Sequence, residues 1–429
     1  MSAVIKEVTS LTRCKEKSFT RNDGVVDANF AGNTLSSNFQ PIFSLSHRRP
    51  IGYEGVLRVI DENNHSVEPM DAFKSLQSEA DVVELDRLSR FLHVNNYKRQ
   101  TTDDSWLFLN IHPVTLNQVH KYGRFLTGLL SEFDIEPNNV VVEIHEDAVD
   151  DNGLLEETVQ YYRDLGCLIA IDDFGTGQSN FDRLWLIEPD IVKLDKSIIR
   201  DLKEKKVIER MLPNLVSLIH ECGSLVLLEG IENEQQALAA VDSGVDFIQG
   251  FYLARPDKKF LTDVTSESLG DSGLDLSTLC SAYQTRVNHD LRSRKKLVNT
   301  YTETVSEAAN EIRKTGDINQ AVQKILTLSG VERCYALNLR GQQIGGNFFP
   351  EEHDELFPQR FAVLEDRAKA TWYRRKYFRR AINEPDQIHT SRPYLSMTAG
   401  IVCITFSILI KSTSGEDIVL CCDIDWSDR

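Results

Sequence analysis

Two adjacent aspartates, Asp172 and Asp173, end an apolar, β-branched run and are followed at once by two glycines. The stretch 168–177 reads Leu-Ile-Ala-Ile-Asp-Asp-Phe-Gly-Thr-Gly, and its apolar part is typical of a strand buried on both faces of a parallel sheet. Neighbouring like charges are costly unless a cation neutralises them, and glycines permit a tight loop close to a ligand. Taken alone, the stretch is better explained by a polar strand end that is followed by an ordinary turn.

Polar residues recur at or near the C-terminal ends of other predicted strands. They are Glu54, Asn110, Glu143, Lys193, Glu229 and Gln249. If these ends converge, their oxygens form a strongly negative cluster, which suits hard divalent cations such as Mg²⁺ or Mn²⁺, whereas zinc would recruit His or Cys. Vicinal aspartates can bridge two ions, and two-metal sites serve phosphodiester hydrolysis. The joint occurrence of these residues therefore predicts a metal-dependent hydrolase.

Two cations accompany the acids. Lys193 can orient the attacking water or offset charge that develops on a phosphate, and Arg58 can pair with a substrate phosphate. Taken singly, each acid is better explained as a cap or a surface carboxylate, Lys193 as a salt-bridge partner at the rim and Arg58 as a solvated side chain. The functional interpretation depends on all of them meeting in one place.

Strand and helix alternate along the segment that carries these residues, which indicates an α/β fold with a parallel sheet. Strands are expected at 39–45, 51–59, 106–111, 139–144, 168–173, 190–195, 225–228 and 245–251, and helices at 71–77, 80–94, 116–133, 154–165, 181–185, 205–222 and 234–242. A barrel gathers every strand end on one face, whereas an open doubly wound sheet gathers only those at its switch point. The number of polar strand ends favours a TIM-like (β/α)8 barrel.

Composition narrows the class of protein. The chain has 429 residues, 41% of them hydrophobic and 26% charged, which is typical of a globular protein with two or three domains. Its 65 acids against 48 bases give a formal charge of −17, so DNA or RNA is not an expected partner. No apolar run reaches the length that spans a membrane, and the polar N-terminal stretch is not expected to act as a secretory signal. Eight scattered cysteines favour reduced thiols, and the expected location is cytoplasmic.

The ordered motifs resemble those of the EAL-domain phosphodiesterases, which hydrolyse the bacterial messenger cyclic di-GMP. The matching segments are Tyr53 to Arg58, Asn110-Ile111, Glu143 to Glu146, Asp172 to Gly177, Lys193 to Asp195, Glu229 to Glu232, Gln249 to Phe251 and Arg255-Pro256. The resemblance covers about residues 36–260. It implies a barrel whose first strand runs antiparallel to the others, and cleavage of one phosphodiester bond to yield the linear dinucleotide pGpG.

The resemblance also implies roles for individual residues. Two Mg²⁺ or Mn²⁺ ions would be held by Glu54, Asn110, Glu143, Asp172, Asp173 and Glu229. The residues expected to take part in catalysis are Lys193 and Glu229, which would activate water, together with Glu54 and Glu146, the latter tethering the loop after Asp173. Those expected near the dinucleotide or its metal and water shell are Gln40, Arg58, Asp195, Glu232, Gln249 and Pro256.

Several positions depart from the family pattern without removing a ligand. They are Gly55-Val56 in place of Ala-Leu, His112 for Ser, His145 for Thr, Gln178 for Tyr and Leu228 for a small residue. Gly55 is expected to raise backbone freedom beside Glu54. Small shifts of this kind can detune catalysis. A receptor that binds cyclic di-GMP without cleaving it is therefore the alternative function, and a scaffold that uses neither messenger nor metal is the third.

The C-terminal third is expected to be a second domain. Residues 262–275 read as a linker, 276–315 as a connecting helix, 331–338, 401–410 and 417–424 as strands, and 364–382 as a helix. The pattern resembles PAS-like or Cache-type sensor domains, as in the YkuI-like EAL proteins, and a small ligand such as an anion would meet Arg374 or Arg379. A purely structural dimerisation module, or a basic surface for an acidic partner, is the alternative. The expected domains are 1–35 (extension), 36–262 (barrel), 263–315 (linker and helix) and 316–429 (α+β sensor), in a homodimer.

Overall fold

A computed structural model shows a chain divided into two compact units, Met1–Thr285 and Arg286–Arg429, which are described separately. The structure describes residues 2–101, 105–117, 125–145, 152–176, 181–200, 206–260, 276–351, 371–396, 400–411 and 416–426. The division falls inside the connecting helix α12 (Leu276–Thr315), whose bounds match those expected from the sequence. The linker expected at 262–275 lies outside the described residues.

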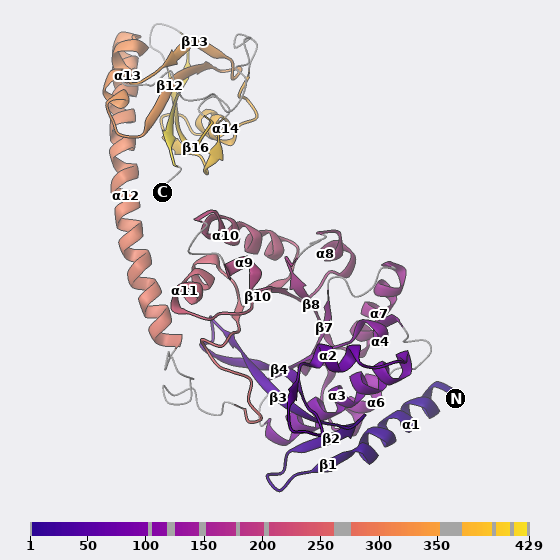
Figure 1. Ribbon diagram of the computed structural model, residues 1–429. Helices are drawn as coiled ribbons and strands as arrows, with labels where there is room; N and C mark the ends of the chain where they lie inside the picture. The colour runs from indigo at the N-terminus through magenta and orange to yellow at the C-terminus, as the bar shows by residue number, and fades with distance from the viewer. Residues whose placement is uncertain are drawn as a thin grey trace. The chain divides into compact units, whose positions relative to one another are not determined.

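Eight strands of the first unit close into a barrel (Figure 1). They are β3 (Asn33–Ser44), β4 (Arg49–Ile60), β6 (Trp106–Asn110), β7 (Val140–His145), β8 (Leu168–Phe174), β9 (Ile191–Leu194), β10 (Leu225–Leu228) and β11 (Phe247–Ile248). β3 pairs antiparallel with both β4 and β11, and the remaining neighbours run parallel. The predicted barrel with an antiparallel first strand is confirmed.

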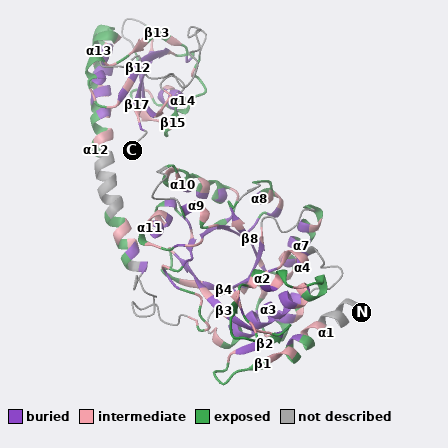
Figure 2. Ribbon diagram, in the orientation of Figure 1, coloured by how far each residue is buried: buried purple, intermediate pink, exposed green. Residues whose placement is uncertain are grey.

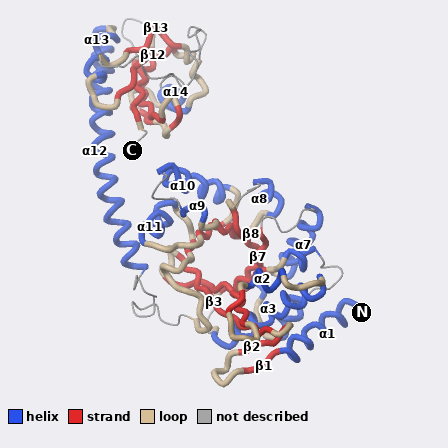
Figure 3. The backbone as a smooth tube through the Cα atoms, in the orientation of Figure 1, coloured by secondary structure: helices blue, strands red, loops and turns tan. Residues whose placement is uncertain are grey.

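Helices surround the ring of strands (Figure 3). They are α2 (Pro69–Lys74), α3 (Glu79–Gln100), α4 (Pro113–Asn117), α6 (Phe125–Glu132), α7 (Asn152–Leu165), α8 (Phe181–Ile187), α9 (Ser197–Arg200), α10 (Lys206–Glu221) and α11 (Glu234–Ser243), with the 3₁₀ turn η1 at Pro137–Asn139. The helix expected at 116–133 is α4 and α6, with 118–124 outside the described residues. The ends of α11 follow elementary capping rules, because the Asn233 side chain accepts a bond from Gln236 N and Gly244 ends the helix in a left-handed conformation.

The barrel strands are buried on both faces (Figure 2). An apolar cluster fills the interior and is made by Ile42, Phe108, Val141, Ala170, Ile191, Leu227 and Phe247. A second, larger cluster lies between the strands and the helices and includes Leu109, Val142, Ile171 and Val192. Because side chains alternate along a strand, the near-continuous apolar runs of the sequence supply both layers.

Residues 1–35, expected as an extension, continue the barrel sheet. Helix α1 (Ser2–Lys17) is followed by β1 (Ser18–Thr20) and β2 (Val26–Phe30), and β2 pairs antiparallel with the start of β3. Ala31 and Gly32, both at positive φ, form the turn of this hairpin. The sheet also continues beyond β4 into β5 (Ser66–Val67).

The second unit is an antiparallel sheet with helices on both faces. Its strands are β12 (Val331–Asn338), β13 (Gln343–Phe348), β14 (His389–Thr390), β15 (Tyr394–Leu395), β16 (Val402–Ile410) and β17 (Ile418–Asp425), in the order β13-β12-β17-β16-β14, with β15 also paired to β16. The second half of α12, with α13 (Ile318–Leu326), packs on one face through Val305, Val322 and their neighbours. Helix α14 (Lys376–Asn383) packs on the other through Tyr377 and Phe378.

The helix expected at 364–382 was partly wrong. Residues 364–370 lie outside the described part of the chain, and 371–375 are not helical. Thr371 forms a bridge with Gln342, and Trp372 N donates to Gly341 O, so this segment follows the β12–β13 turn instead. Within the described part of this stretch, the helix is α14 alone. Among the described residues, no helix combines the length and the apolar character that crossing a membrane requires.

Candidate metal centre

The ammonium of Lys193 lies among four carboxylates from four other strands or strand ends. Its Nζ is 2.5 Å from Glu143 Oε1, 2.7 Å from Glu229 Oε1, 3.0 Å from Asp172 Oδ1 and 3.8 Å from Glu54 Oε2. The side chains of Lys193 and Glu143 are 1% and 0% exposed. One buried positive charge therefore faces four acidic groups, which leaves an excess of negative charge.

Amide side chains complete the arrangement. Asn110 Nδ2 donates to Glu54 Oε1 at 3.1 Å and to Glu143 Oε2 at 2.6 Å. Gln249 Nε2 donates to Glu54 Oε2 at 2.8 Å. The Oε1 atom of Gln249 is buried without a hydrogen-bond partner among the described residues. The amides hold Glu54 and Glu143 in position and leave one acceptor available to a donor that enters the site.

The register of the strands explains why these residues meet. Apart from Glu54 on β4, each of them follows, by two positions, a residue of the apolar cluster inside the barrel. The pairs are Phe108 and Asn110, Val141 and Glu143, Ala170 and Asp172, Ile191 and Lys193, Leu227 and Glu229, and Phe247 and Gln249. Since side chains two apart share one face of a strand, the polar residues form the next layer toward the C-terminal ends of the strands. The convergence that the sequence predicts is observed.

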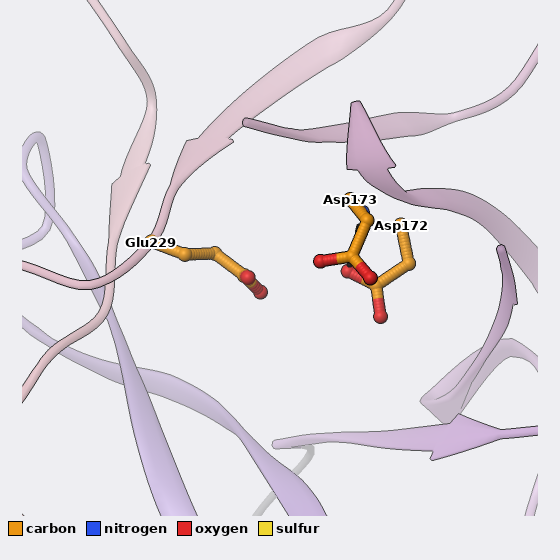
Figure 4. A group of neighbouring side chains, drawn as sticks. All are labelled: Asp172, Asp173 and Glu229. Carbon is orange, nitrogen blue, oxygen red and sulfur yellow. Dashed lines mark hydrogen bonds between the residues drawn. The ribbon is translucent and has the colours of Figure 1, made fainter. Parts of the chain in front are cut away.

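Three carboxylates form a compact group that can hold a metal ion. Ligand oxygens of Asp172, Asp173 and Glu229 lie within 4.8 Å of one another, and Figure 4 shows the aspartates facing Glu229 across the barrel mouth. Asp173, the next-to-last residue of β8, adopts a left-handed backbone conformation with φ 58°, at a point where the pairing of β8 with β9 is irregular. A non-glycine residue is rarely held in this region, and such residues gather at functional sites.

Burial and charge shift the pKa values of the cluster in different directions. Burial raises the pKa of Glu229 to about 8 and that of Glu143 well above its ordinary value, and Lys193 offsets only part of this effect. Burial also disfavours the charged forms of Lys193 and Asp172, but the carboxylates raise the pKa of Lys193, and the ammonium and His145 lower the pKa of Asp172. The neighbouring carboxylates Asp172 and Glu54 add to the rise at both glutamates, and the negative field of these carboxylates also attracts metal cations.

Other predicted residues lie outside this network of contacts. Gln40 is opposite Glu54 in the β3–β4 register, and Arg58 lies four residues after Glu54 on the same face of β4. Burial lowers the pKa of Arg58, whose Nη1 donates to Leu57 O. Pro256 contributes its carbonyl oxygen to a bond from Asn38 Nδ2.

Two acids that were predicted near the substrate, Asp195 and Glu232, make hydrogen bonds to residues close by in the chain. Asp195 Oδ1 accepts a bond from Ser197 N at the start of α9, and Glu232 N donates to Gln236 Oε1. Glu146, expected to tether the loop after Asp173, lies outside the described residues. The same holds for Gln178.

The departures from the family pattern have different physical causes. Leu228 belongs to the cluster between strands and helices, so it faces away from the carboxylates. His112 stacks on Phe73, with ring centroids 4.6 Å apart, and its Nδ1 accepts a bond from Val114 N. His145, in contrast, places Nδ1 3.1 Å from Asp173 Oδ2, and this contact raises the pKa of His145.

Gly55 is explained by a residue that sequence reasoning missed. A β-carbon on Gly55 would lie 2.6 Å from Cγ of His93, which is buried and bonded to Ser37 Oγ and Ser89 Oγ. The expectation that Gly55 adds backbone freedom was incomplete, because the residue sits in the paired register of β3 and β4 opposite Phe39. In the sequence, the only sign of this contact is that a histidine, His93, occupies a position in the apolar periodicity of α3.

Comparison with known proteins identifies the fold and the family. The EAL domain matches residues 25–256. The chain is 27% identical over 363 residues to the EAL-domain protein YkuI of Bacillus subtilis (strain 168), which covers 79% of this chain and 82% of YkuI. It is also 28% identical over 224 residues to the cyclic di-GMP phosphodiesterase PdeF of Escherichia coli (strain K12), which covers 51% of this chain and 29% of PdeF.

A solved structure shows the same architecture. The crystal structure of B. subtilis YkuI, in complex with its substrate cyclic di-GMP and calcium, superimposes with a TM-score of 0.75 at 23% identity and covers 92% of this chain and 96% of that one. The first unit is an α/β barrel with acidic residues at its strand ends. The EAL domain matches more than half of the sequence, and these two findings define the class of protein. The chain belongs to the EAL-domain family.

Proposed function

We propose that the protein hydrolyses cyclic di-GMP to linear pGpG in a reaction that depends on divalent metal ions. The observation that carries the proposal is the position of Lys193 among Glu54, Glu143, Asp172 and Glu229, all in the polar layer at the barrel mouth. Family membership and relatives named as cyclic di-GMP phosphodiesterases support the same substrate.

The donor set fits hard divalent ions. Glu54, Asn110, Glu143, Asp172, Asp173 and Glu229 offer oxygen ligands, and Mg²⁺ and Mn²⁺ prefer such ligands. Carboxylates outnumber the single ammonium of Lys193, and Oε1 of Gln249 has no hydrogen-bond partner within the described part of the chain. Both features favour a site that is completed by cations and their water. When bound, two such ions would stabilise the charge that develops on the attacking and leaving oxygens of the phosphate.

The residues of the chain would prepare water and substrate for attack on phosphorus. Lys193 Nζ, held by Glu229 Oε1 at 2.7 Å, would orient the attacking water and offset charge on the phosphate. Attack forms one P–O bond and breaks the bond from phosphorus to the ribose 3′ oxygen, so the ring opens to the linear dinucleotide. Arg58 and Gln40, on the inner face of β4 and β3, would contact the dinucleotide.

A product assay tests the proposal. The full chain is incubated with cyclic di-GMP and MgCl₂ or MnCl₂, and linear pGpG is separated by chromatography. Product is expected with the natural chain and with Glu62→Gln, an exposed matched control, and not with Glu54→Gln. Messenger binding by calorimetry without any product from the natural chain would instead support a receptor. The contact of His145 with Asp173 favours that alternative, because it engages a proposed metal ligand. Absence of binding would support a scaffold.

The C-terminal unit is proposed to regulate the barrel as a sensor in a cytoplasmic homodimer. Similarity to YkuI extends over 79% of the chain and so includes residues beyond the EAL domain. Light scattering, which gives the oligomeric state, tests the homodimer. Turnover of the full chain, measured with and without anions such as phosphate, tests regulation by the C-terminal unit. A monomer would contradict the first part, and unchanged turnover the second.

A further inference from the structure

His145 lies in the layer that carries the proposed metal ligands. It is the last residue of β7, two positions after Glu143, so it shares the inner face of that strand. In the parallel register it is opposite Asp172. The residue therefore reaches the barrel mouth directly beside the two aspartates.

The backbone directs the carboxylate of Asp173 toward this imidazole. Asp173 leaves the β region at φ 58°, and its carbonyl oxygen accepts bonds from the backbone amide and the hydroxyl of Thr176. The carboxylate then lies 3.1 Å from His145 Nδ1 and also within the compact group that includes Asp172 and Glu229. His145 is not itself a member of that group, but the contact brings its nitrogen to Asp173, which is one of the three members.

The separation of the two atoms is compatible with a shared cation. Neighbouring ligand atoms on an octahedral ion with bonds of about 2.1 Å are about 3 Å apart. The imidazole adds no negative charge to a cluster that already has an excess of carboxylates. Its effect would be on the choice of ion, because imidazole suits first-row transition metals whereas Mg²⁺ prefers oxygen ligands.

We propose that His145 is a nitrogen ligand of the metal ion held at Asp173 and that it shifts the preference of this site from Mg²⁺ toward Mn²⁺. The inference rests on the proposed metal-dependent function and adds a ligand to the oxygen set named above. Binding of the ion through Nδ1 would replace the hydrogen bond between His145 and Asp173, and His145 would then act as a determinant of metal specificity.

Spectroscopy of bound Mn²⁺ tests the ligand directly. Electron spin echo envelope modulation of the full chain loaded with Mn²⁺ is expected to show coupling to an imidazole ¹⁴N, which His145→Thr removes. His112→Ala is the matched control, because the ring of this second histidine stacks on Phe73 and, among the described residues, it shows no contact with the carboxylates of the metal centre. Loss of the coupling only in His145→Thr supports the inference. Absence of the coupling in the natural chain, or its persistence in His145→Thr, overturns it.

Calorimetry with each metal alone distinguishes a ligand from a hydrogen-bonding neighbour. His145→Thr is expected to weaken Mn²⁺ binding by about tenfold and to leave Mg²⁺ binding within about twofold. An equal loss for both ions would mean that His145 only positions Asp173, which overturns the inference while turnover with Mg²⁺ still supports the hydrolase. If the natural chain binds neither ion, both the inference and the proposed function fail.

Discussion

The imidazole of His93 occupies the space that a β-carbon on Gly55 would need, with only 2.6 Å between that carbon and His93 Cγ. The two residues come from α3 and β4, and Gly55 directly follows the proposed ligand Glu54. His93 is held between the hydroxyls of Ser37 and Ser89. The family pattern has Ala where this chain has Gly55, and the buried ring of His93 explains the difference because it leaves no room for a methyl group.

Gly55→Ala is expected to lower the free energy of unfolding by about 1–3 kcal/mol, because the added methyl overpacks the core against His93. Urea unfolding measures the change. Gly128→Ala is the control, since a β-carbon on Gly128 meets no atom within 4 Å, and this change in a helix is expected to stabilise by about 0.5–1 kcal/mol. In the double variant Gly55→Ala, His93→Ala the combined loss should be smaller than the sum of the single losses, and strict additivity would contradict the coupling.

The stability of the chain should fall in mild acid because of His93. Burial lowers the pKa of His93 from 6.5 to about 3. Between these values the unfolded chain binds a proton that the folded chain does not, so the free energy of unfolding decreases as the pH falls through this window. The expected contribution from pH 7 to pH 5 is a loss of about 2 kcal/mol. Urea unfolding of the natural chain and of His93→Gln at pH 7 and pH 5 measures this contribution. Between the two pH values the variant should lose about 2 kcal/mol less of its free energy of unfolding than the natural chain does. An identical pH dependence of the two proteins would refute the assignment to His93.

Removal of the Lys193 ammonium should be strongly destabilising without added metal. Lys193→Met leaves buried carboxylates without their cation, and breaking a buried pair in this way costs about 3–5 kcal/mol. The surface control Lys259→Met should change the free energy of unfolding by less than about 0.5 kcal/mol. Denaturation in the presence of a chelator makes the comparison. Equal stability of the two variants would show that the cluster is not organised by this charge.

A second buried ion pair, in the C-terminal unit, gives an independent prediction. Arg333 Nε donates to Asp423 Oδ2 at 2.8 Å, and Thr405 Oγ1 donates to Asp423 Oδ1 at 2.8 Å. Asp423→Ala leaves the guanidinium uncompensated and should cost about 3–5 kcal/mol. The double variant Arg333→Met, Asp423→Leu should recover most of this loss, as followed by thermal unfolding. A double variant less stable than the single one would contradict the argument.

Much of the barrel and its site could be predicted from sequence because the decisive signals are local. Apolar runs that end in Asn110, Glu143, Asp172 and Glu229 indicate strands buried on both faces, and their alternation with helices indicates parallel order. The expected bounds of α12 and β12 agree with the structure for the same reason, since the periodicity is continuous there. The N-terminal strands were missed because β2 is short and gains its stability from pairing with β3.

Only the tertiary structure decided which side chains touch. The sequence determined that Lys193 follows the aspartates, but the register of five strands places its ammonium within reach of four carboxylates. Contacts such as His93 with Gly55 and His145 with Asp173 depend on packing between segments far apart in the chain or on a single left-handed residue. Residue types and periodicity thus specify the elements and their chemistry, whereas distances between side chains arise only when the barrel closes.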